Sequence, residues 1–582
     1  MKKKPLISLA AILAAASLLL SGCMPALLLK RSPGPEQPGR LVEALNIQRE
    51  AVDFSQLEYV RPDLEEIDAQ VTSALALVKE SGREEELLER YRQLLREIAN
   101  LDTMSTLASI RHDLDLTDEY YEQENLDLDE FYNKLDNRMN ELTGAILDSA
   151  YGEAAREDWG QGFIDRYEIN SKLNSPAIEA LTKQEKELEN EYTKRLTEEY
   201  TTTLNGEEVT IEDLDFTTEE GIYAYYDIYE KKNRALGELY RELVAVRVEI
   251  AGTLGYDSYT DYAYDCLGRD FTKEDAAAFS EKVKKTLAPL YSQLEDFYYE
   301  DIRQAKLRSS VDFQDGLPAL QKALRSDYPE EMGEALDYML QNQLFRFGAD
   351  PNMMQAGYTT ILSGWQAPFM FVNTNVYQAP DTLFHEFGHY YNFYLMDPIL
   401  WNDNNSLDLA EIHSQALEVL MYDAYPELYG EDAELFEIDS LLSLIDSVLM
   451  GCAEDEFQQA VFENPDMSLE EMNLLHAQLY EEYYGYPLIY EWVDIHHHFE
   501  SPFYYISYAT SAISAMEVWE LSVKNRAKAL STYDQITQYT LNSEYLNALK
   551  ESGLKNPFTS NCVEEIAGAL ADLLPDELPQ AA

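Results

Sequence analysis

The chain has 582 residues and a formal net charge of −64, because 108 acidic side chains outnumber 44 basic ones. Its hydrophobic fraction of 46% is enough to bury a large core, which excludes a wholly disordered chain. Binding to a nucleic acid needs clustered lysine and arginine that displace counterions from phosphates. A chain this acidic is therefore expected to bind no nucleic acid, and we interpret the acidic excess as a solvated surface.

The N-terminus has the pattern of a bacterial secretion signal, predicted over residues 1–22. Lysines at positions 2–4 precede an apolar stretch over 5–20, and small residues follow, an order typical of signal peptides. Residues 20–23 resemble the lipobox of bacterial lipoproteins, in which the signal is cleaved before the cysteine and the thiol is lipidated. The resemblance implies a mature chain that begins at Cys23, lipid-anchored in the bacterial cell envelope on the extracytoplasmic side of the membrane. The alternatives are an uncleaved anchor and a chance cysteine.

A tether is predicted between this anchor and the folded body, over residues 23–40. Its segment 32–39 is rich in proline and glycine, which disfavour helices and strands. An N-terminal helical lobe is expected over 41–200, because apolar residues recur at three- and four-residue spacing, for example over 87–101. No later stretch has the roughly 20 apolar residues that span a bilayer, so the body is predicted to be globular.

Few segments predict strands. The residues around Asn205-Gly206 predict a hairpin, because this dipeptide accepts the positive φ angles of a tight turn. Residues 239–250 predict another amphipathic helix, and residues 367–373 predict a second site of strand structure. The fold is therefore expected to be mainly α with a small β-sheet.

Three cysteines lie beyond the N-terminal segment, Cys266, Cys452 and Cys562. Their wide spacing matches no metal or redox motif, and an odd number cannot pair completely within one chain. They are predicted to be buried and chemically idle, although one disulfide would be compatible with their number.

The segment His385-Glu386-Phe387-Gly388-His389 is an HExxH motif. Residues four apart on an α-helix lie about 40° apart around its axis, so both imidazoles can face one ion. The flanking residues contain no helix breaker, and Pro380 offers a start for the helix. Neutral imidazole suits Zn²⁺ better than Mg²⁺ or Ca²⁺, so the motif predicts a zinc site with Glu386 beside the metal.

A catalytic zinc also needs a third protein ligand and one open position for water. One class of zinc protease has a glycine three residues and a histidine six residues after the second histidine. Asn392 and Leu395 occupy these positions, which excludes that class. Glu411 and Glu418 lie two turns apart on one face of a predicted helix, so the pair could act as a metal ligand and as a residue that orients an imidazole. His413 lies on another face and is predicted to be structural or at the rim.

Residues 494–511 form a third cluster, rich in histidine and tyrosine. Aromatic residues at this density most often pack a core, and a run of histidines can bind a metal adventitiously. Beside a zinc protease motif, however, histidine and tyrosine are the donors that stabilise a tetrahedral oxyanion. Both interpretations can hold for different residues of the cluster.

Together these segments resemble the M3 family of zinc metallopeptidases, the group of thimet oligopeptidase and oligoendopeptidase F. The resemblance is carried by Phe384-His385-Glu386-Phe387-Gly388-His389, by Glu411-x-x-Ser414-Gln415-x-x-Glu418, and by His498-Phe499 followed by Pro502-Phe503-Tyr504 and Tyr508-Ala509-Thr510. Residues 247–256 and 267–272 resemble the oligoendopeptidase F branch. The resemblance covers roughly residues 200–570, whereas the N-terminal lobe matches only in being helical.

The resemblance implies a helical two-lobed ellipsoid with a deep channel, a small β-sheet beside the HExxH helix, and a catalytic region over residues 201–575. It also implies that His385, His389 and Glu411 bind one Zn²⁺ and that Glu386 is the general base.

By the same resemblance, His498, Tyr504 and Tyr508 would bind the substrate or stabilise the oxyanion. Because three histidines stand in a row, His497 competes with His498 for this role. Tyr505 likewise competes with Tyr504.

The function implied is zinc-dependent hydrolysis of short, unfolded peptides, since folded proteins cannot enter a deep channel. The substrate is hypothesised to pair with the edge of the strand at residues 369–373, because backbone pairing tolerates varied sequences. Two alternatives stay open. One is a carboxypeptidase-type zincin, which would need a cationic pocket for the C-terminal carboxylate. The other is a lipoprotein that binds peptides without cutting them.

Overall fold

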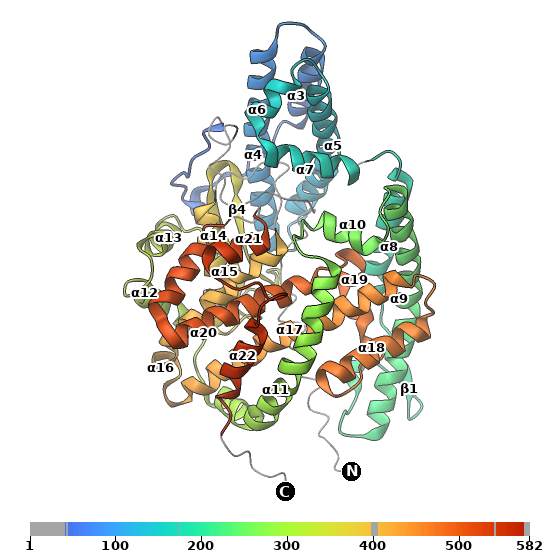
Figure 1. Ribbon diagram of the computed structural model, residues 1–582, viewed down its shortest axis with the longest axis vertical. Coiled ribbons are helices and arrows are strands. Elements are labelled where there is room, and N and C mark those ends of the chain that lie inside the picture. The colour runs from blue at the N-terminus through green and yellow to red at the C-terminus, as the bar shows by residue number, and fades with distance from the viewer. Residues whose placement is uncertain (1–40, 42–44, 174, 397–405, 540–542, 576–582) are drawn as a thin grey trace.

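The computed structural model describes residues 41, 45–173, 175–396, 406–539 and 543–575 (Figure 1). The predicted signal, tether and Cys23 lie outside these residues. The described chain is mainly α-helical, as predicted, with two small sheets. Within these ranges no helix combines the length and the apolar character that a membrane span requires.

The first helices form a bundle that projects from one end of the molecule (Figure 1). They are α3 (Leu64–Val78), α4 (Glu84–Leu114), α5 (Glu119–Leu147), α6 (Gly152–Trp159) and α7 (Gln161–Leu173). The short helix η1 (Phe54–Gln56) precedes them and packs into the core of the main body through Phe54. The apolar stripe predicted over 87–101 lies on α4 and is buried in the core of this bundle. α4 continues beyond the bundle and contacts the sheet of the main body, where Tyr358 donates a hydrogen bond of 2.6 Å to Asp113.

The next segment contains long helices and the predicted hairpin. Its elements are α8 (Glu179–Leu196), β1 (Thr202–Leu204), β2 (Glu207–Val209), η2 (Ile211–Asp213), α9 (Glu219–Thr253), α10 (Tyr259–Cys266), α11 (Lys273–Arg308), α12 (Phe313–Leu324) and α13 (Glu330–Gln341). β1 and β2 pair antiparallel, and the turn residues Asn205 and Gly206 have φ angles of 55° and 88°. The hairpin prediction is confirmed, because both turn residues adopt the left-handed backbone that this dipeptide tolerates.

A three-stranded sheet precedes the HExxH helix. It consists of β3 (Phe345–Gly348), β4 (Gly357–Leu362) and β5 (Ala367–Asn373), in the order β3-β5-β4, with η3 (Ser363–Trp365) between the last two. The strand predicted over 367–373 is confirmed as β5. However, β5 is central, pairing parallel with β3 and antiparallel with β4, and all its residues are buried. The hypothesis that a substrate pairs with this strand is therefore wrong, because β5 has no free edge.

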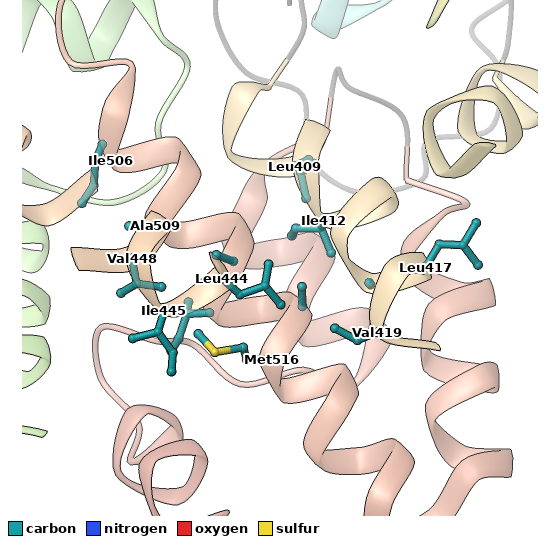
Figure 2. Close-up of a cluster of buried hydrophobic side chains, with 14 of the residues drawn as sticks. Leu409, Ile412, Leu417, Val419, Leu444, Ile445, Val448, Ile506, Ala509 and Met516 are labelled. Carbon is teal, nitrogen blue, oxygen red and sulfur yellow. The ribbon is translucent and has the colours of Figure 1, made fainter. Parts of the chain in front are cut away.

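Three helices of the C-terminal half form the core beneath the HExxH helix, α14 (Pro380–Leu395). They are α15 (Leu407–Leu420), α17 (Ala433–Glu463) and α20 (Tyr505–Ile536), and Figure 2 shows their interlocking apolar side chains. α17 and α20 approach so closely that a Cβ on Gly451 would lie 2.6 Å from the Tyr505 carbonyl oxygen. Only glycine fits at this crossing, which brings α20 directly against the backbone of α17.

The remaining elements connect or cover this core. They are η4 (Met421–Ala424), α16 (Tyr425–Leu428), η5 (Gly430–Asp432), α18 (Leu469–Tyr484), η6 (Glu491–Asp494), α19 (His496–Glu500), α21 (Tyr545–Ser552) and α22 (Cys562–Ala571). The three cysteines Cys266, Cys452 and Cys562 are buried, as predicted, and none of the three forms a disulfide.

Candidate active site

The imidazoles of the HExxH motif and one glutamate converge on a single point. His385 Nε2 lies 3.3 Å from His389 Nε2 and 3.3 Å from Glu411 Oε2, and His389 Nε2 lies 3.4 Å from the same oxygen. A tetrahedral Zn²⁺ with bonds of about 2.0–2.1 Å needs ligand atoms about 3.3–3.4 Å apart. The three atoms therefore form one face of a tetrahedron of the right size for zinc, and the fourth corner is left for another ligand.

The ligands come from α14 and α15, which cross in close contact. Gly388 lies between the two histidines of the HExxH motif in the sequence, at the point where its helix meets the backbone of α15. A Cβ there would lie 2.3 Å from the His413 carbonyl oxygen and 2.6 Å from Ser414 Cα. The glycine of the motif thus permits the approach that brings Glu411 within reach of both imidazoles.

Glu418 orients the first imidazole. Its Oε1 lies 2.7 Å from His385 Nδ1, on the opposite side of the ring from Glu411. A proton held on Nδ1 by this carboxylate leaves the Nε2 lone pair free for a metal. Burial opposes the charge on His385, but the hydrogen bonds to Glu411 and Glu418 outweigh it and raise the pKa of this imidazole well above its usual value.

A hydroxyl group fixes the carboxylate of Glu386. The single hydroxyl proton of Thr359 Oγ1, on β4, is shared between Glu386 Oε2 at 2.8 Å and the Glu386 carbonyl oxygen at 3.0 Å. The side chain is 3% exposed, and burial raises the pKa of its carboxyl despite the nearby charges of His385 and His389. Sequence analysis missed Thr359, because nothing in its strand indicates that it would face the HExxH helix.

The structure does not place His498 where the predicted oxyanion role needs it. This ring is fully buried, and both of its nitrogens have protein partners: Nε2 lies 2.9 Å from Glu454 and Nδ1 lies 2.6 Å from Gln458. An imidazole whose two nitrogens are both engaged in the core has no hydrogen bond left for a substrate. The assignment of His498 as a substrate or oxyanion residue is therefore corrected.

His497 is the histidine that lies among the tyrosines. Its ring centroid is 4.8 Å from that of Tyr504, 5.0 Å from that of Tyr505 and 6.1 Å from that of Tyr508. Within the described chain, its Nδ1 is buried without a hydrogen-bond partner, and burial holds the pKa of this imidazole well below its usual value. His497 is thus a neutral ring with an unused polar atom.

These aromatic residues lie at the start of the ligand helix. Tyr504, Tyr505 and Tyr508 form an apolar cluster with Leu407, the first residue of α15. One turn further along α20, Thr510 Oγ1 donates to Asp408 at 3.1 Å, and Ser511 donates to the Asp408 carbonyl at 3.1 Å. The predicted third cluster is in this way joined to the helix that carries Glu411.

His413 is fully buried on α15. His413 was predicted to be either structural or at the rim of the site, and its burial supports the structural role.

Comparison with known proteins identifies a related sequence family and similar folds. Residues 54–174 match the family model described as the Peptidase M3 N-terminal domain, although sequence analysis had related this segment to the family only by its helical character. A search of curated proteins found no match. Many solved structures share the fold, and three similar ones are PZ peptidase A with an inhibitor, a protein assigned as oligoendopeptidase F, and one so assigned from Bacillus anthracis.

The chain is 25% identical to PZ peptidase A over 89% of its own length and 98% of that chain, with a TM-score of 0.72. For the first oligoendopeptidase F structure the identity is 25%, the coverage 90% and 98%, and the TM-score 0.71. For the Bacillus anthracis protein the identity is 24%, the coverage 90% and 98%, and the TM-score 0.68. The predicted mainly α fold of M3 peptidases is confirmed.

The substitution Gly388→Ala tests the close crossing of α14 and α15. The added methyl group would meet backbone atoms of α15, which cannot move aside cheaply, so the two helices would separate. We expect affinity for zinc to fall roughly 10- to 100-fold, as when residues that orient metal ligands are lost. Competition with a chromogenic chelator measures this affinity.

Gly568→Ala is the matched control. Gly568 lies within α22, and no atom lies within 4 Å of the position that an added Cβ would take. This variant should keep the zinc affinity of the wild type and gain up to about 1 kcal/mol in stability from helix propensity. Wild-type zinc affinity in Gly388→Ala would contradict the packing argument.

Proposed function

We propose that this chain is a zinc-dependent oligoendopeptidase that hydrolyses short, unfolded peptides outside the cytoplasmic membrane. The observation that carries the proposal is the triangle formed by His385, His389 and Glu411, whose edges of 3.3–3.4 Å suit tetrahedral zinc. A buried carboxylate, Glu386, follows the first ligand directly. This combination is the minimum that metal-assisted peptide hydrolysis requires.

Zinc, when bound, would lower the pKa of water toward about 7 and polarise the scissile carbonyl. Glu386 accepts a proton from the attacking water and returns it to the leaving amine. Thr359 holds one oxygen of this carboxylate in a hydrogen bond of 2.8 Å, which keeps its orientation constant through both transfers. Burial of Glu386 favours the proton-accepting step, because it makes the carboxylate a stronger base.

His497, Tyr504 and Tyr508 are proposed to donate hydrogen bonds to the oxyanion of the tetrahedral intermediate. His497 takes the place first given to His498, because it lies among the tyrosines and has an unused nitrogen in the described structure. Donors of this kind act most strongly in a buried, preorganised site, and losing one typically costs roughly 100- to 1,000-fold in rate.

The strand β4 is the proposed backbone partner of the substrate. It is one of the two edge strands of the sheet, and Tyr358, Thr359 and Thr360 are partly exposed along it. Thr359 of this strand also binds Glu386, so a peptide paired with β4 would lie beside the general base. Pairing through the backbone is compatible with substrates of varied sequence.

Replacing Glu386 with glutamine should retain zinc and remove activity. Glutamine keeps the size of the side chain and can still accept the Thr359 hydrogen bond, but it cannot take up a proton from water. We expect kcat to fall roughly 100- to 10,000-fold at unchanged zinc content, measured with a fluorogenic peptide and by elemental analysis. Substitution of the exposed Glu470 by glutamine is the control, and turnover near wild type in Glu386→Gln would contradict the mechanism.

Product mapping distinguishes the proposed endopeptidase from its alternatives. A form lacking residues 1–39 is incubated with zinc and a mixed peptide library, and the products are identified by mass spectrometry. We expect internal cuts in short peptides and none in folded proteins. Products shortened only from the C-terminus would instead indicate a carboxypeptidase, and intact but bound peptides would indicate a binding lipoprotein.

The location is proposed from the N-terminal sequence alone. If Cys23 is lipidated, the full-length protein expressed in a bacterium should fractionate with the membrane, and its N-terminal peptide should carry the mass of the lipid. Cys23→Ser should abolish both, whereas Cys562→Ser, which alters a buried thiol, should change neither. A wild-type protein without a lipid-modified cysteine would contradict this anchor.

A further inference from the structure

Phe503 has a backbone conformation that is unusual for a large side chain. Its φ angle is 65°, in the left-handed region, and its side chain is fully buried. A bulky residue persists there only where the surrounding structure holds it. Phe503 directly precedes Tyr504 and the start of α20, so its conformation sets the direction in which the tyrosines leave the turn.

Both backbone polar groups of Phe503 are held by buried side chains. Its N–H donates to Gln458 Oε1 at 2.5 Å, and its carbonyl accepts from Arg269 Nη2 at 2.5 Å. Arg269 is 3% exposed and Gln458 is fully buried. The two side chains come from different segments of the chain. Together they bond both backbone polar groups of Phe503 and so stabilise its strained conformation.

The same Gln458 amide also bonds His498, which lies on the short helix α19 together with His496 and His497. A backbone N–H can only donate, so the oxygen of the amide must face Phe503 and its nitrogen must face His498. Gln458 Nε2 lies 2.6 Å from His498 Nδ1, which therefore accepts. The proton of His498 is consequently on Nε2, where it is donated to Glu454 at 2.9 Å.

Glu454 completes this network one turn before Gln458 on α17. Its carboxylate accepts from Tyr480 at 2.7 Å and lies 3.2 Å from His476 Nε2. The Nδ1 of His476 lies 2.9 Å from the Leu488 carbonyl, so it carries a proton. Although burial opposes the charges, this pairing raises the pKa of His476 and lowers that of Glu454, which leaves His498 as the neutral member.

We propose that Gln458 is a positioning residue for peptide hydrolysis, one that couples the His497 segment to the tyrosine turn. Its single amide fixes both the ring next to His497 and the strained residue before Tyr504. The proposal rests on the proposed function, since it assigns Gln458 an effect on the donors of that same site. Gln458 itself is fully buried in the core, so its effect on the reaction would be indirect.

Gln458→Leu removes both hydrogen bonds at nearly constant volume. Misplaced donors should reduce kcat roughly 10- to 100-fold, the range typical of small displacements in an active site. KM and zinc content should change little, because the oxyanion contacts form only in the transition state. Gln459→Leu is the matched control: this neighbour on α17 bonds Asp455 and Tyr264, and neither His498 nor Phe503, so its variant should keep kcat.

Gln458→Glu tests the positioning role through a pH dependence of kcat that a purely structural role of Gln458 would not produce. Its carboxylate can still accept from Phe503, but it faces the unprotonated Nδ1 of His498 and repels it. An added proton between the two groups restores that bond. We therefore expect the ratio of variant to wild-type kcat to rise as the pH falls from about 8 to about 6.

Groups on four helices surround His498 and enter this titration: Glu454 on α17, His476 and Tyr480 behind it on α18, Arg247 and Tyr240 on α9, and His497 on α19. These groups are the same in the wild type and in Gln458→Glu. A pH dependence of the ratio of the two kcat values therefore reports the added carboxylate.

The outcomes separate the two proposals. A wild-type protein that cleaves no peptide contradicts the proposed function. An active wild type with unchanged kcat in Gln458→Leu contradicts the positioning role, as does a loss caused by lower zinc content or higher KM. If Gln458→Leu fails to fold, the pH dependence of the Gln458→Glu ratio still decides: a rise toward low pH supports the role, and a flat ratio overturns it.

Discussion

The close crossing of α14 and α15 is the constraint on which the rest of the site depends. A side chain at Gly388 would overlap the backbone of α15, so the contact exists only because that position has none. The crossing brings Glu411 to the two imidazoles and Glu418 to the far side of His385. The sheet then adds Thr359 to the opposite side of the same helix, where it holds Glu386.

A second set of contacts arranges the aromatic side of the site around this crossing. α20 is fixed to α15 through Asp408 and to α17 at Gly451, so helix packing holds Tyr505 and Tyr508 while the turn at Phe503 places Tyr504. Behind them Glu454, Gln458 and His498 hydrogen-bond one another, which compensates for their removal from water. Rigidity of this kind is what an oxyanion site needs, because donors that must reorganise lose most of their effect.

Sequence patterns were sufficient for the local features and insufficient for the contacts between distant segments. The spacing of His385 and His389, the Asn205-Gly206 turn and the limits of β5 follow from helix and strand geometry within a few residues. Three consecutive histidines, by contrast, give no local indication of which ring is buried, and only the partners of His498 on α17 decide it. The sheet order was likewise unreadable, because pairing of β3 with β5 depends on tertiary packing.

The proposed metal ligands also lie close together along the chain, with His389 and Glu411 only 22 residues apart. An ion bound by them closes a short loop, and the entropy lost on closing a loop grows slowly with its length. The free energy of metal binding would therefore mainly stabilise the contact between α14 and α15, and not contacts between remote parts of the fold. Metal loss should accordingly loosen the α14–α15 pair locally and leave the large helical core folded.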